Sequence, residues 1–160
     1  YVTHDQQEAL ALADRVVLMN AGQVAQQGTP EQVYRQPASA WVAGFLGLGT
    51  LLAGRLLPDG AVETALGTLA LPERAALAPD AAVRLLIRPD AALTEVPPNA
   101  PRVSGVLTGC TFRGAHYRCA LRHASGVELM LDLHVPPGAL GSAITLGLDP
   151  RKMQVLPHDR

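Results

Sequence analysis

The residue of this chain best suited to chemistry by its type and position is His4, in the short segment YVTHD. The first three residues have strand character. Asp5 can cap a following helix, and Glu8, three residues later, completes an acidic variant of the capping box. Open α/β sheets place ligand-handling groups at this point, where a strand ends and a helix begins. The other interpretation is a histidine in an ordinary turn, and spacing alone does not separate the two.

The other reactive side chains lack the spacing that catalysis or metal binding requires. The sequence has no phosphate loop of the form G-x-x-x-x-G-K-[ST], because its only lysine is Lys152. No G-x-S-x-G nucleophile elbow occurs, and Ser142 is typical of a turn. No metal site is expected, because no pattern such as H-x-x-x-H connects the histidines His4, His116, His123, His134 and His158.

The composition is that of a protein with a hydrophobic core in one or two small domains. Of the 160 residues 48% are hydrophobic and only 4% aromatic, so valine, leucine and alanine must fill the core. The net charge of -1 and the absence of a basic run do not favour a nucleic-acid partner. No signal peptide is expected, because no positively charged start precedes an apolar region.

An uncharged, largely apolar stretch at 38–54 resembles a transmembrane segment in composition. It is shorter than the roughly 20 residues that a spanning helix needs, and glycines interrupt it. We predict instead a short helix from Ser39 to Leu46, a glycine-rich joint and the first strand of a new domain.

After Gly47 the pattern changes to short strands separated by glycine and proline, which is typical of an all-β barrel or sandwich. The proline-rich stretch 96–101 cannot continue a sheet ladder and is expected to be a linker. The two flanking halves are alike: PDGAVETA matches ASGVELML, and VRLLIRPD matches AITLGLDP. This indicates either a duplication or turns that small β domains share. The predicted strands are 50–57, 61–64, 68–71, 83–87, 103–112, 116–122, 127–133, 144–148 and 153–156.

A series of motifs in residues 1–47 agrees with one family. After Thr3-His4-Asp5-Gln6 come Ala13-Asp14-Arg15, Val16 to Met19, Gly22-Gln23-Val24, Gln27-Gly28, Thr29-Pro30-Glu31 and Tyr34 to Pro37. This order closely resembles the end of the nucleotide-binding domain of ABC-transporter ATPases of the importer subfamily. The resemblance implies that the first motif is the switch loop. It also implies that His4 is a catalytic and ATP-binding residue, which contacts the γ-phosphate and the attacking water.

The segment Ile87-Arg88-Pro89-Asp90 resembles the Arg-Pro-Glu signature of the transport-associated OB (TOBE) domain, which follows the nucleotide-binding domain in these importers. Asp90 stands where the family usually has glutamate. We therefore predict a mainly β fold: an OB-like (TOBE) β-barrel domain at 48–160, with two lobes split near 96–101. Residues 1–47 are predicted to be the C-terminal α/β tail of an ABC nucleotide-binding domain.

The resemblance implies a C-terminal, regulatory piece of a longer ATPase. The chain lacks the phosphate loop, the magnesium carboxylates and the signature motif, so we expect it neither to bind ATP usefully nor to hydrolyse it alone. In the full-length parent the cofactors are expected to be ATP and magnesium. The expected partners are a second copy, in a homodimer held together by the TOBE domains, two membrane permease subunits and a solute-binding protein. The expected location is cytoplasmic, on the inner face of the membrane. Importers of ferric iron, polyamines, sugars, sulfate and thiamine share these motifs, so the solute stays open.

The two cysteines are expected to face each other across a β-hairpin. Arg113 to His116 has the composition of a tight turn, with Gly114 at the first central position of a II′ turn. The resulting register gives an apolar face with Cys110, Phe112, Tyr117 and Cys119, and a polar face with Thr111, Arg113, Arg118 and Arg122. Such cysteines can form a disulfide. Because the resemblance implies a reducing compartment, we expect two small buried apolar side chains instead.

Two alternative functions belong to other classes. The first is a free-standing OB module for small oxyanions such as molybdate, held by backbone amides at the glycine-rich turns. The attached ATPase-like tail argues against this alternative. The second is an OB-type nucleic-acid binder, which needs a basic groove with stacking aromatic side chains. One tryptophan, two phenylalanines, three tyrosines and a negative net charge do not meet that need.

Overall fold

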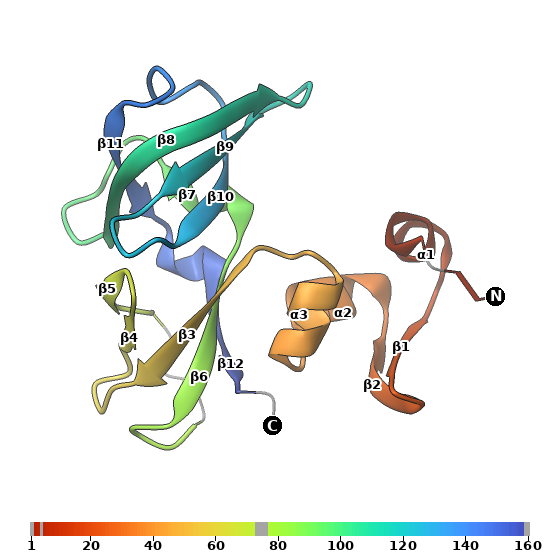
Figure 1. The fold of residues 1–160 in the computed structure, drawn as a ribbon. Coiled ribbons are helices and arrows are strands. Elements are labelled where there is room, and N and C mark those ends of the chain that lie inside the picture. Colours follow the sequence, from red (N-terminus) through yellow and green to blue (C-terminus); the bar gives the residue numbers. More distant parts are fainter. Residues whose placement is uncertain (1, 4, 73–76, 159–160) are drawn as a thin grey trace.

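A small α/β segment is followed by a β domain in a computed structural model that describes residues 2–3, 5–72 and 77–158 (Figure 1). The α/β segment contains α1 (Gln6–Leu12), β1 (Val16–Asn20), β2 (Gln23–Gly28), α2 (Pro30–Arg35) and α3 (Ala40–Phe45). The β domain contains β3 (Thr50–Leu56), β4 (Val62–Thr64), β5 (Gly67–Leu69), β6 (Ala82–Ile87), β7 (Ala92–Leu93), β8 (Arg102–Phe112), β9 (Tyr117–Arg122), β10 (Glu128–Leu133), β11 (Ala143–Leu148), β12 (Met153–Pro157) and two 3₁₀ turns, η1 (Pro89–Ala91) and η2 (Pro150–Lys152). Within these described ranges, no helix combines the length and the apolar character needed to cross a bilayer.

Side-chain caps start all three helices, and α1 and α3 start where the sequence predicted. The Glu8 amide donates to Asp5 Oδ1 at 3.0 Å, and the Val42 amide donates to Ser39 Oγ at 3.3 Å. Thr29 and the residue three positions later form a reciprocal capping box at α2. These caps satisfy amide groups that have no intrahelical partner, so short helices of six or seven residues end and begin at defined positions.

The β domain repeats one arrangement of strands twice. Its two five-stranded sheets have the orders β12-β6-β3-β4-β5 and β7-β11-β8-β9-β10. If the run β3 to β7 is matched with the run β8 to β12, the two orders become identical. The strand that follows each 3₁₀ turn pairs with the sheet of the other half: β7 with β11, and β12 with β6. Of the two explanations for the likeness between the halves, this repeated order favours duplication, and it shows that the halves exchange their last strands.

One hydrophobic cluster fills the space between the two sheets. It is made mainly of aliphatic side chains, as the low aromatic content requires, and its most completely buried members include Leu85, Leu107, Leu129 and Leu148. The first and last of these come from the strands β6 and β11, which hold corresponding positions in the repeat. Residues 96–101 join no sheet, as predicted, and contain a turn in which the Ala100 amide donates to the Pro97 carbonyl. The boundaries at 47/48 and near 96–101 stay predictions.

The hairpin of β8 and β9 has the predicted register but only part of the predicted burial. Cys110 lies opposite Cys119, and Phe112 lies opposite Tyr117. The hairpin reaches beyond the rest of its sheet (Figure 1), so Phe112 is 60% exposed and packs on the Tyr117 ring, 5.1 Å away, instead of entering the core. A bulge between Leu107 and Gly109, which the sequence did not predict, shifts the register farther along the strand.

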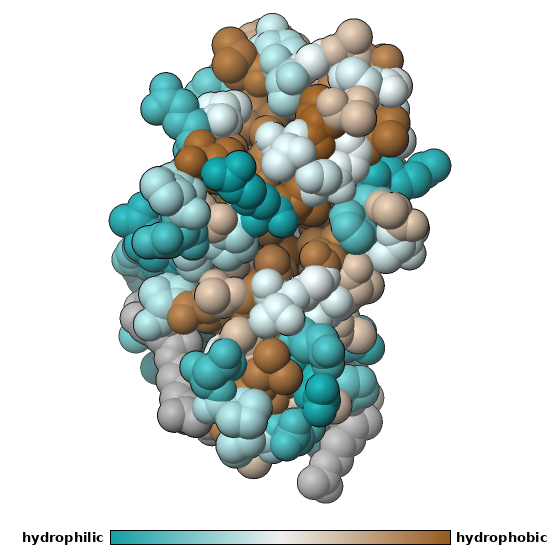
Figure 2. Space-filling model, turned by 90° about the vertical axis from the view of Figure 1, so that its left-hand side faces the viewer, coloured by the Kyte–Doolittle hydropathy of each residue, from teal (hydrophilic) through white to brown (hydrophobic). Residues whose placement is uncertain are grey.

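The face of the β domain turned away from the N-terminal helices carries no single apolar surface. Figure 2 shows apolar side chains in separate patches between hydrophilic ones, with apolar atoms also along the middle of the face. Isolated patches of this kind are ordinary for a folded surface.

Candidate functional site

His4, the predicted catalytic and ATP-binding residue, lies outside the described residues, so its role stays a prediction. The residues on either side of it are held by local hydrogen bonds. The Asp5 amide donates to Thr3 Oγ1 at 3.0 Å, and Thr3 Oγ1 donates to Glu8 Oε2 at 3.3 Å. The second bond attaches Thr3 to the first turn of α1.

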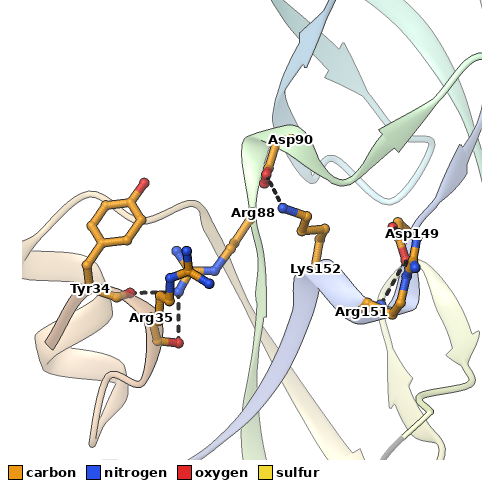
Figure 3. Close-up of polar contacts among 7 residues, drawn as sticks. All are labelled: Tyr34, Arg35, Arg88, Asp90, Asp149, Arg151 and Lys152. Carbon is orange, nitrogen blue, oxygen red and sulfur yellow. Dashed lines mark hydrogen bonds and ion pairs between the residues drawn. The ribbon is translucent and has the colours of Figure 1, made fainter. Parts of the chain in front are cut away.

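A direct polar contact attaches the α/β segment to the β domain through Arg88 (Figure 3). Its guanidinium donates to the Tyr34 carbonyl at 2.7 Å and to the Arg35 carbonyl at 3.3 Å, and it lies 5.1 Å from the centre of the Tyr34 ring. Both carbonyls are at the end of α2, where helices leave carbonyl groups without intrahelical partners. A cation at a helix C-terminus also interacts favourably with the helix dipole. Arg88 therefore closes the end of α2 from a different part of the chain.

The two 3₁₀ turns, η1 and η2, are bonded to each other directly behind Arg88. The Arg88 amide donates to the Lys152 carbonyl at 3.1 Å, and the Asp149 amide donates to the Ala91 carbonyl at 2.8 Å. Lys152 Nζ donates to Asp90 Oδ2 at 2.6 Å (Figure 3), so both charged residues of the Arg-Pro-Asp signature have partners. The Arg-Pro-Asp signature thus forms a junction: Arg88 contacts the end of α2, and Asp90 contacts Lys152, the residue directly before β12.

Asp149 is the corresponding acidic residue of the second turn, and it is nearly buried. Its two oxygens accept hydrogen bonds from the Arg151 guanidinium at 3.0 and 2.8 Å (Figure 3). These bonds hold the pKa of the Asp149 carboxyl below its usual value, against the opposing effect of burial. Asp149 also caps η2 by accepting from the Arg151 amide. Sequence reasoning did not assign Tyr34, Asp149, Arg151 or Lys152 to a site. The likeness of VRLLIRPD to AITLGLDP was the available signal for the last three.

Helix α3 joins the hydrophobic cores of the two parts. Val42 is buried in the core of the α/β segment, whereas Ala43 packs in a cluster with Leu86 of β6. Leu46, at the end of the helix, packs against both clusters. The glycine-rich joint that follows is closely packed: a Cβ on Gly49 would overlap the Ile87 carbonyl oxygen. The joint between the two parts is thus fixed by packing as well as by Arg88.

A pocket of about 270 Å³ lies where η1 and β7 meet the end of β10. It is lined by Asp90, Ala92, Thr94, His116, Asp132, Leu133, His134 and Val135. Asp132 accepts two hydrogen bonds of 2.8 Å from Arg118, which keep its pKa below the usual value. Both lining carboxylates are already paired with cations, Asp90 with Lys152 and Asp132 with Arg118, so the pocket by itself points to no particular charge of ligand. Among the residues that the structure describes, no group of three or more His, Cys, Asp or Glu is placed to hold a metal ion.

The contact of Arg88 with α2 leads to a prediction. Replacing Arg88 by Met keeps the apolar stem but removes the donors, so the end of α2 should be destabilised by about 1 kcal/mol. Hydrogen exchange should then become faster for the amides of α2 and α3 and stay unchanged in β8 and β9. The matched control is Arg84→Met on β6, the strand that ends directly before Arg88. If both variants changed exchange in α2 equally, the contact would not be the cause.

Comparison with known proteins identifies a family for part of the β domain and relatives for nearly the whole chain. Residues 85–156 match the TOBE domain family. The chain is 34% identical over 157 residues to the spermidine/putrescine import ATP-binding protein PotA of Acetivibrio thermocellus, covering 98% of this chain and 43% of that protein. It is 38% identical over 157 residues to the Fe(3+) ions import ATP-binding protein FbpC of Streptomyces coelicolor, covering 97% and 43%. It is 39% identical over 142 residues to the sulfate/thiosulfate import ATP-binding protein CysA 2 of Chromobacterium violaceum, covering 87% and 38%.

These comparisons concern a longer kind of protein, because the chain spans less than half the length of each of these relatives. A solved structure of the cytoplasmic molybdate-binding protein ModG shares the fold, with a TM-score of 0.57 at 10% sequence identity, covering 68% of this chain and 96% of that one. The predicted mainly β, OB-like fold is thereby confirmed. The match over residues 85–156 and the match over nearly the whole chain lead to one assignment: the chain carries a TOBE domain and is homologous to the TOBE-bearing part of the ATP-binding proteins of ABC importers.

Proposed function

We propose that this chain is the regulatory part of an ATPase subunit that powers solute import, joined to the last portion of its nucleotide-binding domain. The observation that carries the proposal is the alignment of 98% of the chain with an import ATP-binding protein, across both the α/β segment and the β domain. A free-standing OB module would align with the β domain alone. The fixed contact through Arg88 and α3 supports a unit in which the two parts work together.

The surface of the α/β segment supports its place in a larger domain. The outer face of the β1–β2 hairpin is apolar: Met19 lies opposite Val24, and both are more than half exposed. Leu12 on α1 is 77% exposed. Large apolar side chains exposed on several elements of so small a segment are typical of a surface that other protein covers. In the parent subunit, the remainder of the nucleotide-binding domain is the expected cover.

The cofactors, partners and location follow from this assignment. In the full-length subunit ATP and magnesium are the expected cofactors, with His4 at the γ-phosphate. The expected partners are a second copy of the subunit, permease subunits in the membrane and a solute-binding protein, which place the subunit on the cytoplasmic face. The three relatives are named for import of three chemically different solutes, a polyamine, ferric iron and sulfate or thiosulfate. The solute is therefore expected to be selected by other components of the transporter.

The first test compares this chain with the full-length subunit. The isolated chain should show neither ATP turnover nor micromolar ATP binding, since it has no phosphate loop to hold the triphosphate. The full-length subunit should hydrolyse ATP and co-purify with its permease. Radiolabelled ATP hydrolysis and equilibrium dialysis measure both. Turnover by the isolated chain, or a full-length subunit that neither hydrolyses ATP nor binds a permease, would contradict the proposal.

A further inference from the structure

Cys110 and Cys119 occupy the one kind of cross-strand position in which two cysteines come close together. The Arg113 amide donates to the His116 carbonyl at 2.8 Å and closes a two-residue turn. Hydrogen-bonded and non-hydrogen-bonded pairs alternate away from such a turn, so the pair Cys110–Cys119, three positions along, is non-hydrogen-bonded. The Cα atoms of such pairs are about 4.5 Å apart and their side chains are close together. This spacing lies at the short end of the range found in disulfides, about 4.4–6.8 Å.

The two thiols differ in access. Cys119 is 1% exposed and belongs to the main core cluster, whereas Cys110 is only half-buried at the edge of that cluster. Burial is the largest of the causes that raise the pKa of Cys119 to about 12. Cys119 therefore stays protonated at neutral pH, and Cys110 is the thiol that a reagent from solution meets first. Neither cysteine is in a disulfide in the structure.

We propose that Cys110 and Cys119 form a reversible thiol–disulfide site that is oxidised by small hydroperoxides such as hydrogen peroxide. The inference is independent of the import function, because it depends only on the β8–β9 hairpin. It differs from the expectation of two inert apolar side chains, which describes the reduced state alone. A reducing compartment keeps the pair as thiols, and the pair reacts when peroxide rises.

The reaction has two balanced steps. In the first, the Cys110 thiolate attacks one peroxide oxygen, a sulfur–oxygen bond forms, the oxygen–oxygen bond breaks, and hydroxide leaves and takes up a proton as water. Cys110 is then a sulfenic acid. In the second, the Cys119 sulfur attacks the Cys110 sulfur, the disulfide forms, and the sulfur–oxygen bond breaks. The Cys119 proton leaves with the oxygen as a second water. The two cysteines lose two electrons in total, and the peroxide gains them.

The oxidised hairpin should be easy to reduce. Cys110 is only half-buried, and disulfides with an exposed sulfur are reduced more readily than buried structural ones. The bond would join β8 to β9 between the bulge at Leu107–Gly109 and the exposed aromatic pair Phe112–Tyr117. Its formation would restrict the projecting end of the hairpin without changing which strands pair. The site would thus be a reversible covalent cross-link between β8 and β9.

The test is peroxide oxidation of the folded chain, followed by thiol counting and peptide mapping by mass spectrometry. We expect both titratable thiols to disappear together, with the loss of two hydrogen atoms and a peptide from β8 joined to one from β9. Reduced glutathione should restore both thiols. Two results would overturn the proposal: thiols that persist, or products limited to chain-to-chain disulfides and over-oxidised Cys110.

Single-cysteine variants separate the two roles. Cys119→Ala should leave Cys110 as a sulfenic acid that dimedone traps, whereas Cys110→Ser should leave Cys119 unreactive while the chain stays folded. Equal trapping of both cysteines would overturn the assigned order of attack. Circular dichroism before and after oxidation checks the fold. If a variant does not fold, the mapping of the unchanged chain still decides whether the disulfide forms.

Discussion

Replacing His4 by Ala in the full-length subunit should slow ATP hydrolysis by about 100-fold or more while leaving ATP affinity nearly unchanged. The resemblance assigns His4 to the γ-phosphate and the attacking water, so the imidazole acts mainly in the transition state. Binding of the ground-state triphosphate depends instead on the phosphate loop and magnesium, which lie outside this chain. A group that acts only in the transition state lowers kcat and leaves binding intact. Single-turnover hydrolysis and nucleotide binding measure the two effects separately.

The matched control for this experiment is Gln7→Ala, an exposed position on the first turn of α1. It should change neither turnover nor affinity. Unchanged turnover in the His4 variant would contradict the assignment of His4 as the switch histidine. The assignment of the TOBE domain would not be affected, because it depends on other residues. A large loss of ATP binding would instead indicate that His4 maintains the structure of the site.

A chain of contacts leads from α1, which follows His4 in the sequence, through α3 to the β domain. Gln6 Nε2 donates at 2.6 Å to the carbonyl of Phe45, the last residue of α3. The same helix packs on Leu86 of β6 through Ala43, and Gly49 just beyond it packs on the Ile87 carbonyl. Movement of the segment near His4 is therefore opposed by contacts that reach the β domain. This arrangement suits a regulatory domain that responds to the nucleotide-binding domain beside it.

Local features of the fold were predictable from the sequence. Caps at Asp5 and Ser39 gave correct helix starts, and the turn at Gly114 gave the register of β8 and β9. These features depend on residues close together in the sequence, so turn and cap chemistry defines them. The bulge after Leu107 and the exposure of Phe112 were not predictable, because they depend on how far β8 extends beyond its neighbours.

The contacts of the candidate site were not predictable, because their partners are far apart in the chain. Arg88 and Tyr34 are separated by 54 positions, and Lys152 and Asp90 by 62. The signature at 87–90 located one side of each contact, but no local pattern identifies which helix end or which turn lies opposite. Exchange of β7 and β12 between the halves likewise depends on the packing of complete sheets. The sequence likeness between the two halves indicated that there are two halves, but it did not show which strands of one half pair with the other.

The exchange of β12 leads to the second prediction with a large expected effect. Ending the chain after Lys152 removes β12, which pairs with β6 along its whole length, from Met153 opposite Ile87 to Pro157 opposite Val83. Met153 and Leu156 are buried, and removing two such side chains should cost about 3–6 kcal/mol. A domain of this size is typically stable by only about 5–15 kcal/mol. Because both sheets share one core, the loss should lower the urea midpoint of the whole β domain and not only of the first half.

Ending the chain after Pro157 is the matched control, since it keeps all of β12 and should leave the urea midpoint unchanged. A peptide of residues 149–158 added to the shorter chain should restore the midpoint, because β12 already reaches its sheet as a strand from the other half of the domain. Disruption of β7 by Ala92→Asp should cost less, because β7 forms only the pairs with Gly147 and Leu148. An unchanged midpoint without β12 would mean that the exchanged strand adds little, and that each half is stable by itself. Loss of the whole domain with rescue by the peptide would instead make the exchange the feature that turns two similar halves into one cooperative unit.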